Sequence, residues 1–181
     1  MIIFASTVMK LVHWVRFTWD LDKLPALAPV LPLHYHFDEV SQPNEREVRA
    51  VIARSLAHDT SWGDAIHEVT AMIESWLEDV FAPEKNGICV ALRHGSRIIG
   101  ATVLNPNPAT DDHLAPGPCI QMEYRSRGLG TALLGEGLRR LQEAGLSRAA
   151  TLARLNGPAA RFLYPKFNGA MMPATTPLLA A

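Results

Sequence analysis

The sequence predicts one α/β (α+β) domain in which strands and helices pack around a common core. The 181 residues are 48% hydrophobic and 19% charged, a length and composition that support one packed core. The hydrophobic pattern runs in the order strand, two helices, hairpin, strand, helix, strand, helix, without an internal repeat or a low-complexity linker. Residues 1–181 are therefore expected to form a single domain.

The N-terminal region predicts strands followed by an extended connector. Residues 1–17 are rich in Ile, Val, Phe and Trp, which favour one or two strands. Prolines in "LPALAPVLP" exclude a helix, and the alternating "LHYHF" of residues 33–37 favours a further strand. Residues 1–31 are expected to be an N-terminal extension. Its apolar start lacks the basic residues and cleavage site of a secretory signal, and it is too short to cross a bilayer.

Two amphipathic segments come next. Residues 41–56 predict a helix that Ser41 or Gln42 caps and that has Pro43 in its first turn. Residues 61–81 predict a second helix, because apolar residues recur there at helical spacing. Trp62 and Trp76, near its two ends, are interpreted as core residues.

The second half of the chain alternates strands and helices. Residues 88–104 predict a hairpin that turns at "RHGS", and the proline-rich residues 105–118 predict a loop. The other predicted elements are a strand at 119–123, a helix at 131–144 that Gly145 ends, a strand at 149–155 and a short helix at 156–164. Gly135 and Gly137 are interpreted as points where the 131–144 helix packs closely on the sheet.

Charge and cysteine usage exclude several classes of protein. The formal net charge is −1, which argues against a nucleic-acid or membrane partner. Cys89 and Cys119 form no CxxC pair, so both are expected to be reduced and buried in a cytoplasmic protein. His34 and His36 flank Tyr35 on one side of a strand, but no third ligand accompanies them, and no metal site is expected.

The stretch "EYRSRGLGTALL", residues 123–134, predicts an anion-binding turn. Gly128 and Gly130 let the backbone approach a ligand closely, and the N–H groups of the following helix turn favour a negative charge. Arg125 and Arg127 add guanidinium groups that suit phosphate oxygens. No lysine follows the glycines as a Walker loop requires, and Leu133 occupies the third glycine position of a Rossmann fingerprint. A nucleotide-binding protein of another fold is therefore disfavoured.

The order R-x-x-G-x-G at residues 125–130, after a strand and before a helix, resembles the [QR]-x-x-G-x-[GA] signature of the GNAT superfamily of N-acetyltransferases. This resemblance implies a mixed, mostly antiparallel central sheet with helices on both faces, and acetyl-CoA as co-substrate. It also implies that the backbone at Cys119 and Ile120 binds the pantetheine arm. The pyrophosphate would be held by Arg125, Ser126, Arg127, Gly128, Leu129, Gly130 and Thr131.

A second motif, "NGPAARFLYPKF", is similar to the family segment N-x-x-A-x-x-[FL]-Y. The resemblance implies that Asn156 lies beside the pantetheine and that a tyrosine protonates the departing thiolate. Leu163 occupies the expected tyrosine position, and Tyr164 follows one residue later. One residue is about 100° around a regular helix, so Tyr164 can act as this acid only if the turn is irregular.

The implied activity is transfer of an acetyl group to a primary amine by direct attack in a ternary complex, with a small-molecule or peptide acceptor. The base candidates are Glu123, Asp112 and His113, although "DDH" in a proline-rich loop is also typical of a solvated turn. The alternative is a non-catalytic acyl-CoA-binding or sensor domain of the same fold. A homodimer would cover exposed sheet edges.

The C-terminal end is shorter than the family pattern. Only about a dozen residues follow Gly169, where the family usually places two more strands. We hypothesise that the N-terminal strand fills the sheet position that this short tail leaves empty.

Overall fold

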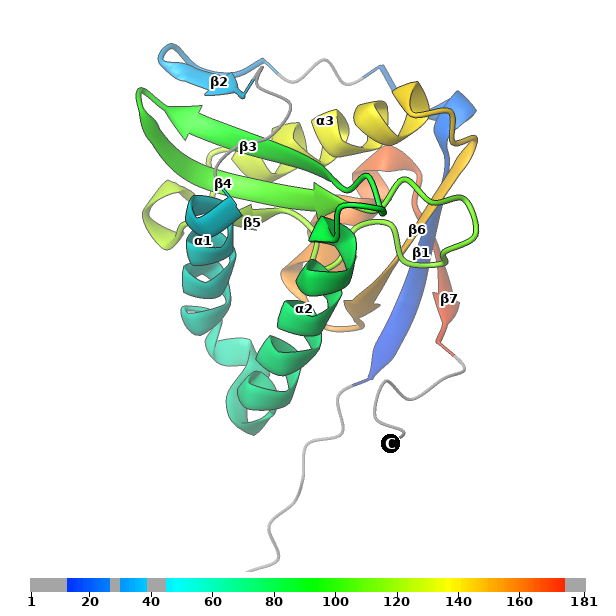
Figure 1. Cartoon of the computed structure of the whole chain (residues 1–181), viewed down its shortest axis with the longest axis horizontal. Coiled ribbons are helices and arrows are strands. Elements are labelled where there is room, and N and C mark those ends of the chain that lie inside the picture. Colours follow the sequence, from blue (N-terminus) through cyan, green and yellow to red (C-terminus); the bar gives the residue numbers. More distant parts are fainter. Residues whose placement is uncertain (1–12, 27–29, 39–44, 175–181) are drawn as a thin grey trace, which may run out of the picture.

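A computed structural model describes residues 13–26, 30–38 and 45–174 (Figure 1). The strands are β1 (Trp14–Asp20), β2 (Tyr35–Phe37), β3 (Ile88–His94), β4 (Arg97–Leu104), β5 (Cys119–Ile120), β6 (Arg148–Arg154) and β7 (Ala170–Pro173). The α-helices are α1 (Glu45–Ala57), α2 (Ile66–Phe81) and α3 (Leu129–Glu143). Short helical turns span Leu21–Lys23, Thr60–Ala65, Met122–Tyr124, Ala159–Leu163 and Tyr164–Phe167.

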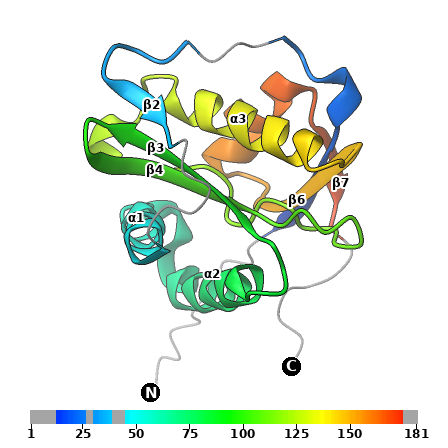
Figure 2. The same ribbon diagram turned by 45° about the horizontal axis from the view of Figure 1, so that its top comes forward.

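The strands form two sheets rather than one. One sheet has the order β2-β3-β4-β5, the other β6-β1-β7, and the paired neighbours in both are antiparallel. Helix α3 covers one face of the β2-β3-β4-β5 sheet, whereas α1 and α2 cover its other face (Figure 2). The α/β fold class and the helices on both faces are as predicted.

Side chains on the two faces of β4 divide the core into two parts. Ile99 and Leu104 join the larger cluster, which includes α3, whereas Ile98, Ala101 and Val103 join the cluster of α1 and α2. The strand is thus buried on both faces, and its alternation changes phase at a β-bulge, because the register with β3 shifts around Ile99. Gly137 lets α3 approach β4, because an added Cβ would lie 3.4 Å from Leu104 and Thr102. The predicted packing on the sheet thus holds for Gly137, but not for Gly135, where an added Cβ would lie 3.2 Å from the ring of Phe167 instead.

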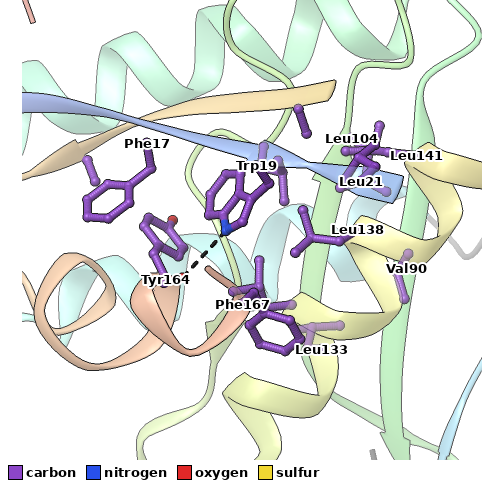
Figure 3. Close-up of a cluster of buried hydrophobic side chains, with 14 of the residues drawn as sticks. Phe17, Trp19, Leu21, Val90, Leu104, Leu133, Leu138, Leu141, Tyr164 and Phe167 are labelled. Atoms are coloured by element: carbon purple, nitrogen blue, oxygen red, sulfur yellow. Dashed lines mark hydrogen bonds between the residues drawn. The ribbon is translucent and has the colours of Figure 1, made fainter. Parts of the chain in front are cut away.

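Strand β1 lies between the two C-terminal strands. It pairs with β6 along its whole length and with β7 at residues 15–18. The hypothesis that a strand from the N-terminal region occupies this position is confirmed for Trp14–Asp20; residues 1–12 lie outside the described part of the chain. Phe17 and Trp19 point from β1 into the core against Tyr164 (Figure 3).

The predicted helices are present, with shifted ends. The expected cap at Ser41 or Gln42 lies outside the described residues. The second helix was expected from residue 61, but a 3-10 turn with Gly63 at φ 53° precedes α2. Helix α3 begins at Leu129, two residues early, and ends before Gly145, whose φ of 93° is typical of a C-cap glycine.

The expected strand at 119–123 is wrong beyond Ile120. Met122–Tyr124 form a 3-10 turn, and β5 keeps only two residues.

The sheets separate at the prolines before β5. Pro116 and Pro118 have no N–H to donate, so the backbone at these residues cannot continue a hydrogen-bonded ladder toward β6. The two sheets therefore separate between β5 and β6.

The packing of β1 on the C-terminal segment predicts a large cost for truncating Phe17. Its side chain is 1% exposed and its ring centroid lies 5.1 Å from that of Tyr164. We expect Phe17→Ala to lower the free energy of unfolding by about 3–5 kcal/mol in urea denaturation. Met171→Ala is the matched control, since Met171 is the β7 partner of Phe17 but is 55% exposed. Equal effects of the two substitutions would contradict the proposed role of β1.

Candidate functional site

A cavity of about 390 Å³ lies where the two sheets separate. Residues 118–120 line one side of it and residues 152–154 the other, and α1, α2 and the start of α3 complete the walls. The sheets are joined at one end, where His113 N–H donates to Ala150 O (2.7 Å) and Ala150 N–H donates to His113 Nδ1 (3.1 Å). The cavity therefore begins at a closed vertex and runs toward the N-terminus of α3.

The predicted anion-binding turn borders this cavity. Ser126 and Gly128 have φ values of 61° and 76°, so the chain turns sharply into α3. Ala132 N–H is bonded to Gly128 O at 3.1 Å, and the N–H groups before it belong to the first helix turn, which offers no intrahelical acceptor. A Cβ built on Gly128 would meet no atom within 4 Å. This open helix start fits the phosphate groups of a co-substrate.

The side chain of Arg125, which was predicted to hold pyrophosphate, makes hydrogen bonds within the protein. Its Nε donates to Ile120 O at 3.0 Å, and its Nη2 donates to Ser55 O at 2.8 Å and Ser55 Oγ at 3.1 Å. These bonds connect the anion-binding turn to β5 and to α1. The guanidinium thus positions the turn, and Arg127, whose Nη2 donates to Glu123 O, is exposed beside Tyr124.

Asp112 lies at the vertex and lines the cavity. Thr151 Oγ1 donates to its Oδ1 at 3.0 Å. Burial raises the pKa of this carboxyl to about 6, and the hydrogen bonds from Thr151 and the backbone of Leu152 oppose that rise. A buried carboxyl with a pKa near 6 can accept a proton at neutral pH.

Tyr164 also lines the cavity, although it follows the expected tyrosine position by one residue. Residues Ala159–Leu163 form a π-helical turn, in which Tyr164 N–H bonds to Ala159 O five residues earlier. A π turn accommodates one extra residue, so it offsets the displacement seen in the sequence. The hydroxyl lies against Gly117, where an added Cβ would come within 2.4 Å of it. Burial, and then the charge of Asp112, raise the pKa of Tyr164 well above its ordinary value.

Seven predicted residues are not on the cavity lining: four belong to the turn and the start of α3 (Arg127, Gly128, Leu129 and Thr131), and the others are Glu123, His113 and Asn156. Glu123 is exposed and pairs with Arg97 at 3.3 Å. His113 is buried, and its Nδ1 accepts a hydrogen bond from Ala150 N–H at 3.1 Å, so it joins the two sheets. Asn156 is exposed in the turn after β6. Of the base candidates, only Asp112 faces the cavity.

Cys119 and Ile120 line the cavity, and pantetheine binding by their backbone stays a prediction. Trp62 and Trp76 also line the cavity, and they pack on the core as predicted. Burial raises the pKa of the Cys119 thiol to about 12, so it is neutral at physiological pH. The sequence did not point to Ser55, Thr151 or Gly117. The "PGP" around Gly117 was a usable signal of a tight turn, whereas Ser55 and Thr151 carry no local signal.

A profile of the acetyltransferase (GNAT) family matches residues 51–170. The chain belongs to the GNAT acetyltransferase family. This membership supports acyl transfer as its general chemistry, and the matched range contains the anion-binding turn, Asp112 and Tyr164.

Solved structures of GNAT proteins share the fold. A GCN5-related N-acetyltransferase from Sphaerobacter thermophilus has a TM-score of 0.60 and 19% identity, over 90% of this chain and 49% of that one. One from Kribbella flavida has a TM-score of 0.54 and 16% identity, over 90% of this chain and 55% of that one. The chain thus spans about half the length of these structures. Among curated proteins, no relative matched.

Two further features of the described residues concern a membrane and a metal ion. None of the helices there has the length and apolar character needed to span a bilayer. Within the same ranges, no three His, Cys, Asp or Glu side chains gather in a group that could hold a metal ion.

The buried carboxyl of Asp112 predicts a pH-dependent cost in stability. Its pKa rises from an ordinary 3.8 to about 6 on folding, so the folded chain keeps a proton that the unfolded chain has lost. The stability that this retained proton contributes is therefore fully present below about pH 4 and is lost as the pH rises through about 6. Asp112→Asn cannot ionise, and we expect it to raise the free energy of unfolding at pH 8 by up to about 3 kcal/mol.

Urea denaturation of both proteins between about pH 4 and pH 8 checks this expectation. The difference in free energy of unfolding between Asp112→Asn and the parent should become smaller toward the acidic end of this range. A difference that does not change with pH would contradict the burial of an ionised carboxylate at this position.

Proposed function

We propose that the chain transfers an acetyl group from acetyl-CoA to a primary amine by direct attack in a ternary complex. The observation that supports this most strongly is the convergence of three features on one cavity: the open N-terminus of α3, the carboxyl of Asp112 and the side chain of Tyr164. The GNAT family typically uses acetyl-CoA, which supports the choice of co-substrate.

The co-substrate would bind along the opening between the sheets. The backbone N–H groups of Gly128, Leu129 and Gly130 would hold the pyrophosphate, since helix N-termini favour anions. The pantetheine arm would then run past Cys119 and Ile120 toward the vertex, where the thioester would meet the acceptor.

Asp112 is the proposed general base. An amine bound in the cavity as an ammonium must lose a proton before its nitrogen can attack the thioester carbon. Asp112 is a carboxylate above about pH 6 and can take that proton. The hydrogen bond from Thr151 fixes the orientation of the carboxylate.

Tyr164 is the proposed general acid. As the new C–N bond forms, the C–S bond breaks and the thiolate must be protonated; Tyr164 is a neutral phenol with a proton to donate. An acyl-enzyme route through Cys119 is disfavoured, because its pKa of about 12 leaves too little thiolate to act as a nucleophile. Direct transfer is therefore the mechanism that the site supports.

Replacing Asp112 should slow chemistry without weakening co-substrate binding. We expect Asp112→Asn to lower kcat for thiol release by about 10²–10⁴-fold, because the amide still accepts from Thr151 but cannot take a proton. Acetyl-CoA affinity, measured by calorimetry, should be unchanged.

Glu123→Gln is the matched control, since it makes the same carboxylate-to-amide change at an exposed residue outside the cavity lining. It should leave kcat unaltered. If the two variants behaved alike, Asp112 would not be the base. Thiol release by neither parent nor variants, with acetyl-CoA bound, would contradict the catalytic proposal itself.

A further inference from the structure

Three tryptophans gather along one part of the cavity. Trp14 comes from β1, Trp62 from the turn before α2, and Trp76 from α2. The ring centroids of Trp14 and Trp62 are 5.9 Å apart, and the guanidinium carbon of Arg154 lies 4.5 Å from the Trp62 ring centroid. We call Trp14, Trp62 and Trp76 the aromatic wall.

The aromatic wall is anchored by the backbone on one side. Trp14 and Arg154 are direct partners in the pairing of β1 with β6, and Trp62 packs against both side chains. Trp62 therefore joins the α1–α2 connection to the β6-β1-β7 sheet. Aromatic side chains fixed in this way offer a large apolar surface with little rotamer entropy left to lose on binding.

The rest of this part of the cavity is also apolar. Leu56, Val69, Met72 and Ile73 line it from α1 and α2. A ligand body rich in hydroxyl or ammonium groups would lose its hydrogen bonds to water against these side chains without gaining replacements. An apolar body would instead bury its surface favourably.

Of the charged residues on the lining, Asp112 and Arg125 belong to other parts of the cavity, whereas Arg154 and Asp59 adjoin Trp62 of the aromatic wall. Asp112 lies at the vertex, and Arg125 is bonded to Ser55 and Ile120. Arg154 stacks on Trp62, and Asp59 lies just beyond the end of α1. Asp112 is hydrogen-bonded to Thr151 and Trp14 pairs with Arg154, so the carboxylate and the aromatic wall are three residues apart along β6, about 10 Å. The cavity thus presents a carboxylate for an amine and, at this distance from it, an aromatic surface for the substituent of the amine.

We infer that the acceptor is a primary amine with an aromatic body, of the arylalkylamine class, whose ring packs on the aromatic wall while its nitrogen faces Asp112. This inference rests on the proposed function and adds the class of acceptor.

Steady-state thiol release at saturating acetyl-CoA tests the inference with amines that share an aminoethyl group. The panel is tryptamine, phenethylamine and ethanolamine, together with spermidine and kanamycin as polycationic and polyhydroxylated amines. We expect kcat/KM for the two aromatic amines to exceed that for ethanolamine by about 100-fold, because only they bury a ring. Spermidine and kanamycin should be poorer than the aromatic amines.

Trp62→Ala tests whether the preference for aromatic amines depends on the aromatic wall. It should lower kcat/KM for phenethylamine at least about tenfold and leave that for ethanolamine nearly unchanged. Phe81→Ala is the matched control: Phe81 is also an aromatic residue of the α1–α2 region with an arginine over its ring, at 5.4 Å, but it does not line the cavity. Phe81→Ala should leave the ratio of kcat/KM for phenethylamine to kcat/KM for ethanolamine unaltered. The parent panel is decisive if Trp62→Ala does not fold.

The outcomes separate the inference from the proposed function. The inference is supported if the aromatic amines are acetylated fastest and if Trp62→Ala, but not Phe81→Ala, lowers the ratio of kcat/KM for phenethylamine to that for ethanolamine. Fastest turnover of ethanolamine, spermidine or kanamycin overturns it and leaves amine acetylation standing. Thiol release with none of the five amines, despite bound acetyl-CoA, overturns the inference and counts against the proposed function as well.

Discussion

Two sheets that are joined at one end and separate at the other create the cavity on which the functional features of this chain depend. His113 and Ala150 make the joining hydrogen bonds, and Pro116 and Pro118 cannot extend them. The separation exposes the edges of β5 and β6 to a ligand instead of to each other. Strand β1 makes this arrangement stable, because it gives β6 a hydrogen-bonded partner on its other side.

Several features that reduce stability lie around this cavity. Ser126 has a positive φ in the turn before α3, the π turn inserts a residue before Tyr164, and Asp112 is a buried carboxyl. Each is less stable than a regular alternative would be. Features of this kind are typical of functional sites, where geometry needed for binding or proton transfer takes precedence over stability.

Local chemistry made part of this structure predictable. The glycines and helix pattern around residues 123–134 predicted the turn and α3, and the "RHGS" turn predicted the β3–β4 hairpin, because these signals act between near neighbours. Partners far along the chain could not be read in the same way. Arg125 was expected to face an anion, but its donors reach Ser55, 70 residues away. The direction of Tyr164 depends on a π turn and on the space beside Gly117, which only the folded packing reveals.

The most direct test of the account is calorimetric titration of acetyl-CoA into the parent protein, a Gly128→Trp variant and a Gly145→Trp variant. Both glycines have positive φ, at 76° and 93°, and neither would bring a Cβ within 4 Å of other atoms, but only Gly128 starts α3 at the cavity. We expect acetyl-CoA to bind to the parent and to Gly145→Trp, and not to Gly128→Trp. Equal binding to all three, or binding to none, would contradict this expectation.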